Sequence, residues 1–209
     1  MAKLDELEFD DLPQEETHEF EVDLRCVVVL NHRFTLEGID HSEEEDLAEI
    51  RRSFSHNHEA MSSEVSHVGI FYDELRQAAN RLALVGLVTR LQHWIGKYVT
   101  RCDVKGMKTS APLIVQLEAL NGSLGTGPVP VAYFEELVNV RDSVIHADSK
   151  AEWKYKRARA VESCHRNTCG EVELNEAQIK EAIARAVQQV KWYDSRLVSR
   201  HRVSNNSNS

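Results

Sequence analysis

Arg141, Asp142 and His146 are the residues of this 209-residue chain whose types and spacing could carry chemistry. An arginine keeps its charge at neutral pH, and its rigid fork of donors can hold two phosphate oxygens at once. A histidine with an unperturbed pKa of about 6.5 can exchange protons near neutral pH. Asp142 could orient a histidine of its own chain or of a partner, or it could cap the helix that carries it. The three types together suit proton transfer beside an anionic phosphate group.

A helix must position these residues. After Pro130, apolar residues recur mostly at three- and four-residue steps, which is the pattern of an amphipathic helix. The pattern consists of Val131, Phe134, Leu137, Val138, Val144 and Ile145. Arg141 lies in line with this apolar stripe, where a charge must be paired or reach water. His146 lies about 140° further round a regular helix. The two side chains therefore meet only if the helix ends or bends between them, or if a second copy of the chain contributes.

The motif R-D-x-x-x-H formed by Arg141, Asp142 and His146 resembles the signature of HEPN domains, with the resemblance covering roughly residues 62–200. It implies a mainly α fold, a HEPN-like four-helix bundle with additional helices, and a homodimer whose two motifs face one groove. It also implies a metal-independent endoribonuclease without a cofactor, in which the 2′-hydroxyl of the RNA is the nucleophile. Arg141, Asp142 and His146 would then be the catalytic residues of a toxin or antiviral-defence effector.

One position departs from the pattern of the family. Members that are silenced by a nucleotidyltransferase antitoxin often carry a tyrosine two residues after the histidine, and the corresponding residue here is Asp148. Silencing by adenylylation is therefore not expected. Another antitoxin or a regulatory protein remains open as a partner.

The net charge of −9 is concentrated at the N-terminus, because residues 1–24 hold ten acidic residues against one lysine and the remainder is neutral. A basic stretch follows the motif. A solvated helix face explains such a stretch, but beside a phosphate-handling pair it could also contact an RNA backbone. The candidate RNA-binding residues are Lys150, Lys154, Lys156, Arg157 and Arg159.

The chain divides into four parts on its composition and periodicity. We expect a disordered acidic tail over residues 1–18, an N-terminal appendage over 19–61, a helical bundle over 62–200 and a disordered tail over 201–209. In the appendage, the apolar residues Phe20, Val22, Leu24, Cys26, Val28 and Leu30 alternate with Glu19, Glu21, Asp23 and Arg25. This two-residue period predicts a strand that turns at Asn31 into a β-hairpin ending at Gly38. Ser42 is the expected cap of a short helix that ends near Phe54.

The bundle begins after a polar, histidine-rich linker over residues 55–67. A broad apolar band predicts a long helix over about residues 63–101. Shorter helices are expected over residues 111–120 and 175–197, the second capped by Asn175. The glycine-rich segment 121–128 lacks the Lys-Ser/Thr of a nucleotide-binding loop, so we interpret it as a connection.

Several classes of protein are disfavoured. No apolar run approaches the roughly 18 residues that a membrane helix needs, and the chain does not start with a signal-peptide pattern. The four cysteines do not suggest a disulfide framework, so we expect a cytoplasmic protein. Neither His56, His58 and His67 nor Cys164, His165 and Cys169 complete a zinc site, and we expect no metal.

Two alternatives to the nuclease stay open. The first is a non-catalytic HEPN-like module that binds or dimerises to regulate a partner protein. The second is an unrelated helical interaction protein in which Arg141 pairs with a core acid and His146 caps a helix.

Overall fold

The computed structural model describes residues 15–146 and 173–206, and every regular element in these ranges is a helix. The N-terminal helix is continuous and consists of α1 (Glu15–Leu24), the π-helical turn η2 (Arg25–Val29) and α2 (Leu30–Ser53). It is followed by α3 (His58–Arg101), α4 (Leu113–Leu124), α5 (Val131–His146) and α6 (Glu176–Asn206). The expectation of a mainly α fold is confirmed.

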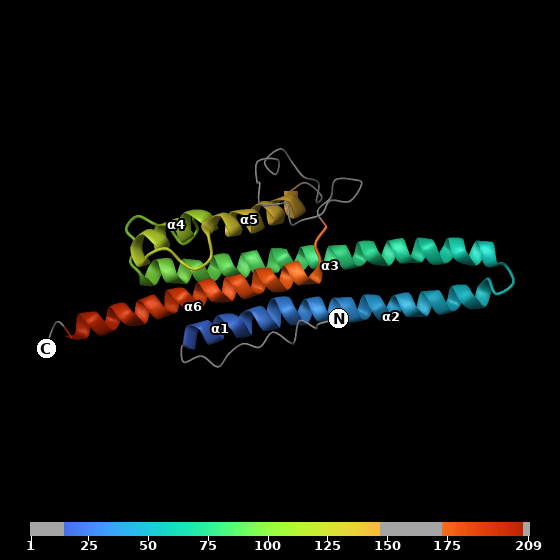
Figure 1. Ribbon diagram of the computed structural model, residues 1–209, viewed down its shortest axis with the longest axis horizontal. Coiled ribbons are helices and arrows are strands. Elements are labelled where there is room, and N and C mark those ends of the chain that lie inside the picture. The colour runs from blue at the N-terminus through green and yellow to red at the C-terminus, as the bar shows by residue number, and fades with distance from the viewer. Residues whose placement is uncertain (1–14, 147–172, 207–209) are drawn as a thin grey trace.

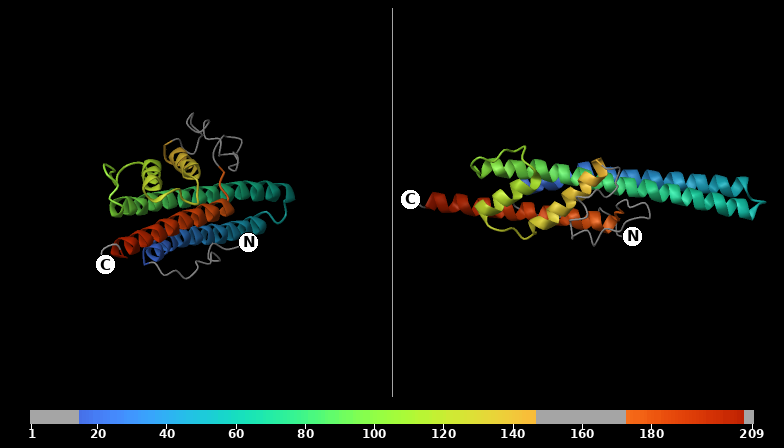
Figure 2. Two further views of the ribbon diagram at one scale, coloured as in Figure 1. Left: turned by 60° about the vertical axis from the view of Figure 1, so that its left-hand side comes forward. Right: turned by 90° about the horizontal axis from the view of Figure 1, so that it is seen from above.

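The helices form an elongated bundle around α3 (Figure 1). α2 and α3 run antiparallel to each other, α6 packs against α1 and α3, and α5 packs against α3 and α4. Seen from above, α4 and α5 lie over α3 and α6 (Figure 2). One core cluster includes Phe20 of α1, Leu91 of α3, Leu117 of α4, Phe134 of α5 and Ile183 of α6. The N-terminal helix therefore shares its core with the helices expected to form the bundle, and the expected boundary at residue 61 falls inside α3.

The predicted β-hairpin is wrong, because residues 15–53 are helical. Phe20, Leu24 and Val28 are at most 2% exposed, whereas Val22, between the first two, is 45% exposed. These three buried residues are four positions apart. Because apolar residues at every second position also fall at every fourth position, the sequence pattern was consistent with a helix as well as with a strand. A strict four-residue step drifts by about 40° per turn on a regular α-helix. The wider π-helical turn at Arg25–Val29 falls where this drift would carry the apolar stripe away from the core.

The linker expected over residues 55–67 is also much shorter in the structure. Asn57 caps α3, and its side chain accepts a hydrogen bond from the Ala60 backbone N–H at 3.1 Å, so the helix starts at His58. Ser42 is not a helix cap, because α2 already runs through it from Leu30. At the other end of the chain, Asn175 caps α6 as expected, with its Oδ1 2.9 Å from the Gln178 N–H.

The helices expected over residues 63–101, 111–120 and 175–197 are present with shifted ends. Residues 15–18 and 201–206, assigned to disordered tails, belong to α1 and α6. No helix of the described ranges is long and apolar enough to cross a membrane.

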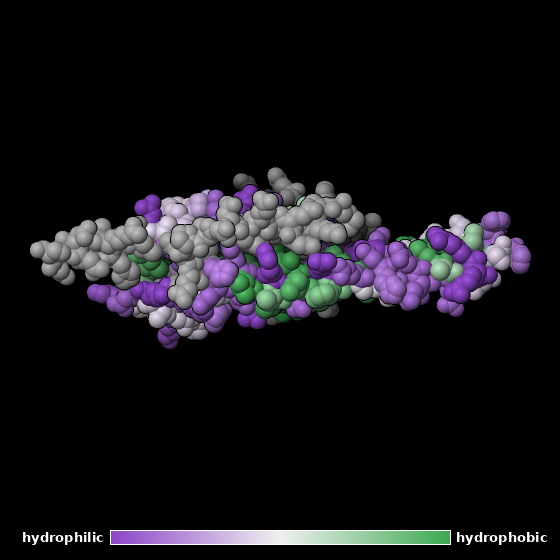
Figure 3. All heavy atoms as spheres, turned by 90° about the horizontal axis from the view of Figure 1, so that it is seen from below, coloured by the Kyte–Doolittle hydropathy of each residue, from purple (hydrophilic) through white to green (hydrophobic). Residues whose placement is uncertain are grey.

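The far ends of α2 and α3 extend beyond the other helices as an arm, residues 33–76 (Figure 1). Among the described residues, none from 33 to 71 is buried. Phe34, Ile70 and Phe71 of the arm and the adjacent Leu82 are 54–66% exposed. From below, hydrophobic side chains gather near the middle of the molecule and again near the end of the arm (Figure 3).

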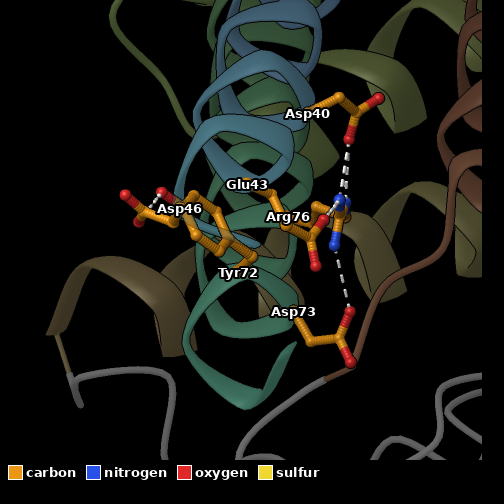
Figure 4. Close-up of polar contacts among 6 residues, drawn as sticks. All are labelled: Asp40, Glu43, Asp46, Tyr72, Asp73 and Arg76. Atoms are coloured by element: carbon orange, nitrogen blue, oxygen red, sulfur yellow. Dashed lines mark hydrogen bonds and ion pairs between the residues drawn. The ribbon is translucent and has the colours of Figure 1, made fainter. Parts of the chain in front are cut away.

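Polar contacts join the two helices of the arm (Figure 4). Arg76 of α3 binds Asp40 at 2.8 Å and also Glu43, both on α2, and contacts Asp73 one turn away at 3.2 Å. The Tyr72 hydroxyl donates a hydrogen bond to Asp46 at 2.6 Å. This bond, together with burial, raises the pKa of Tyr72 to about 12. Ionic and polar contacts therefore join the two helices of the arm, together with half-buried apolar side chains such as Ile50, Phe54 and Val65.

Candidate functional site

The motif residues lie in the last two turns of α5. The buried side of this helix is rotated relative to the stripe predicted from sequence. Glu136, Val140 and Ser143 are at most 8% exposed, whereas Ile145 is 52% exposed. Arg141 is therefore at the edge of the buried face, which explains how its guanidinium reaches polar partners.

Arg141 and Asp142 form an ion pair on the surface of α5. Nε and Nη2 of Arg141 donate to Oδ1 of Asp142 at 2.9 and 2.6 Å. The side chains are 19% and 46% exposed, respectively. Nη1 of Arg141 lies 3.5 Å from Oε1 of Gln92 on α3, at the limit of a hydrogen bond. Gln92 was not identified from the sequence, where nothing distinguishes it from other polar residues of α3.

His146 is the last residue of α5, and only its place on the helix is described. Because α5 is helical from Val131 to His146, no bend separates positions 141 and 146. On a regular helix these positions are about 140° apart, whereas positions 142 and 146 are about 40° apart. Positions 142 and 146 are thus one turn apart on α5. Both hydrogen bonds from Arg141 end on Oδ1 of Asp142, so this ion pair leaves Oδ2 unused.

The predicted RNA-binding residues, Lys150, Lys154, Lys156, Arg157 and Arg159, lie outside the described residues, as do Asp148, Cys164, His165 and Cys169. Within the described ranges, no group of three histidine, cysteine or acidic residues could hold a metal ion.

Glu136 is a second group with unusual surroundings that the sequence analysis missed. It lies on α5 and is 8% exposed, and burial raises its pKa to about 7. The spacing of the sequence could have indicated this burial. Glu136 is three residues after Tyr133 and four before Val140, so the three residues share one face of a helix.

Comparison with known proteins gives no relative for this chain. No family model matches it, and no significant match is found among curated proteins or solved structures.

The described side chains at this end of α5 are a guanidinium, whose donors suit an anion, and the half-exposed carboxylate beside it. Arg141, Asp142 and His146 all belong to one helix, which packs on α3.

Proposed function

We propose that the chain is a metal-independent endoribonuclease of HEPN type that acts as a homodimer. Arg141 holds the scissile phosphate, and His146 transfers protons in the attack of the 2′-hydroxyl on phosphorus. Asp142 orients the imidazole. The 2′-oxygen bonds to phosphorus as the 5′-oxygen leaves and takes up a proton, which gives a cyclic phosphate and a 5′-hydroxyl. One histidine acts as base and the histidine of the second copy as acid.

The observation that carries this proposal is the identity of the residue that forms an ion pair with Arg141. A structural arginine on a helix edge stabilises a bundle by pairing with an acid of another helix. Here the carboxylate partner is Asp142, the next residue on the same helix, and this partly exposed pair contributes little stability. The two ionic groups are better explained by a ligand than by the fold.

The geometry of α5 supports the proposed homodimer. Positions 141 and 146 do not converge along one straight helix, so a composite site supplies the second imidazole. Ile145, between them in the chain, is 52% exposed, and a large apolar side chain beside the motif suits an interface between copies. The basic residues from Lys150 to Arg159, which follow the motif in the sequence, would contact the RNA backbone. Toxicity towards a host cell, or defence against a phage, is the biological role that this activity would serve.

Cleavage of a short single-stranded RNA in the presence of EDTA tests the proposal. The wild type should cleave it, and Arg141→Ala and His146→Ala should reduce the rate at least about a hundredfold, the usual contribution of such groups. Arg52→Ala and His56→Ala replace exposed residues of the arm and should cleave normally. The all-deoxy substrate, which lacks the nucleophile, should stay intact. Cleavage by all five proteins would indicate a contaminating nuclease and contradict the assignment.

A non-catalytic module that binds a partner protein is the second candidate. It is favoured by the arm, where Phe34, Ile70 and Phe71 are more than half exposed. RNA binding without cleavage, or no interaction with RNA, in the same experiment would select this candidate.

A further inference from the structure

A small cavity lies between α3, α5 and α6, about 170° round α5 from Asp142. Its volume is about 40 Å³, and its walls include Leu84 of α3, Leu137 of α5 and Ile179 of α6. A buried water molecule needs about 10–15 Å³ by this kind of measure. The cavity is therefore large enough for a group of a few non-hydrogen atoms.

Polar groups of the cavity lining come from Tyr133, Glu136, Gln178 and Glu181, and of these four residues only Glu136 is buried. The residue is 8% exposed, and no donor among the described residues reaches its Oε1. A buried carboxylate without a donor is costly, because neither water nor protein replaces its hydration. A ligand that donates hydrogen bonds and carries positive charge would therefore stabilise the Glu136 carboxylate.

The nearest arginine does not meet this need. Nη2 of Arg185 binds Glu181 at 2.6 Å, and the guanidinium lies 4.3 Å from the centre of the Tyr133 ring. Arg185 lowers the pKa of Glu136 only in part, and burial, assisted by Glu181, prevails and raises it to about 7. Glu181 also lines the cavity, and its side chain is 53% exposed, which places a second carboxylate towards the solvent.

We propose that this cavity binds a small primary ammonium group, with Glu136 as the principal acceptor and Glu181 near the entrance. An ammonium group has three donors and a compact charge. The apolar walls accept one or two carbon atoms of an alkyl chain. Two carboxylates repel an anion, and a neutral alcohol leaves the charge of Glu136 uncompensated. The site is separate from Arg141 and His146, so it does not depend on the proposed nuclease.

The test is an NMR titration of the full-length protein with isotope-labelled glutamate carboxyls, with and without ethylammonium chloride. A cation that binds the ionised carboxylate must lower the apparent pKa of that carboxylate by linkage. The Glu136 signal should titrate near pH 7 without ligand and about one unit lower at saturation, equivalent to about tenfold weaker amine binding to the protonated form. The signal is identified by its loss in Glu136→Gln.

Tetramethylammonium chloride at the same concentration is the matched control, because it has the charge but no N–H donor and is larger. It should leave the midpoint unchanged. Glu135→Gln, which replaces the exposed neighbour on α5, should keep the response to ethylammonium. Glu181→Gln, a change at a half-exposed side chain that does not disturb the core, should weaken it. The proposal fails if ethylammonium leaves the Glu136 midpoint in place, or if tetramethylammonium shifts it equally.

Discussion

Oδ1 of Asp142 accepts two hydrogen bonds from Arg141, its neighbour in the chain, at 2.9 Å from Nε and 2.6 Å from Nη2. Because both residues belong to α5, the ion pair holds no two helices together. Position 146 is one turn further along α5, about 40° away round the helix from position 142. In the proposed mechanism, Asp142 therefore connects the group that binds phosphate with the group that transfers protons.

Asp142→Asn should therefore affect activity far more than stability. The partly exposed pair contributes less than about 1 kcal/mol to folding, whereas loss of the carboxylate leaves the imidazole without its orienting acceptor. We expect the free energy of unfolding to change by less than about 1 kcal/mol and RNA cleavage to fall by at least about tenfold. Urea denaturation and single-turnover cleavage measure the two quantities. A large loss of stability with normal cleavage would make Asp142 a structural residue.

The sequence predicted correctly the helices whose apolar residues recur at helical steps. The prediction was wrong where the apolar residues fitted the two-residue period of a strand and the period of a helix at the same time. α3 and α6 were predicted because Leu87, Leu91, Ile183 and Val190 recur at helical steps over several turns. Between Phe20 and Val28, apolar residues at every second position fit a strand and a helix equally well. Packing against α3 and α6, which no local pattern reveals, decides in favour of the helix.

The candidate site was predicted in its residues and only partly in its geometry. Residue types identified Arg141, Asp142 and His146 from their spacing. The rotation of α5 that exposes Ile145 and buries Glu136 depends on how α5 and α6 face each other, and this relationship is set by tertiary contacts alone. The contact between Arg141 and Gln92, separated by 49 positions, was inaccessible for the same reason.

Arg76→Met should loosen the arm without unfolding the bundle. Arg76 is the positive centre of three carboxylates, two of them on α2, and its removal leaves these acids to repel one another. Since the side chain is 30% exposed and partly screened by solvent, we expect a local loss of about 1–2 kcal/mol. This loss corresponds to about tenfold faster amide hydrogen exchange in residues 36–75.

Arg33→Met is the matched control for this change. The ion pair of Arg33 with Glu37, at 2.8 Å, joins two residues one turn apart on α2, so its loss removes a contact within one helix. Equal exchange rates in the two variants would show that the Arg76 contacts do not hold the arm together.

Gly127→Ala should destabilise the connection between α4 and α5. A Cβ at this position would lie 2.2 Å from Nε2 and 2.8 Å from Cδ of Gln189, so that side chain must move. Gln189 is 1% exposed, and its Oε1 accepts a hydrogen bond from the Val129 N–H at 3.2 Å. Moving it leaves the buried Val129 N–H unpaired, and we expect the free energy of unfolding to fall by about 1–3 kcal/mol, as measured by thermal or urea unfolding.

Gly122→Ala is the control, because open space surrounds this glycine within α4 and alanine should stabilise the helix. Similar effects of both substitutions would show that Gln189 has room to move.

Glu136 should make the protein less stable as the pH rises towards neutral. Its pKa is raised from 4.5 to about 7 in the folded state, mainly by burial. Between these values the folded protein keeps the proton that the unfolded chain has lost, so the free energy of unfolding decreases with increasing pH and levels off above about 7. The whole decrease amounts to about 3 kcal/mol at most, at about 1.4 kcal/mol per unit. Glu136→Gln, which has the same shape and no charge, should remove this dependence and be the more stable protein at pH 8, as measured by urea denaturation from about pH 5 to about pH 8.

Glu135→Gln, at the exposed neighbouring position, should retain the slope of the wild type. A wild-type stability that rises over this range, with no difference between the two variants, would mean that the Glu136 carboxylate is already ionised and compensated in the folded protein.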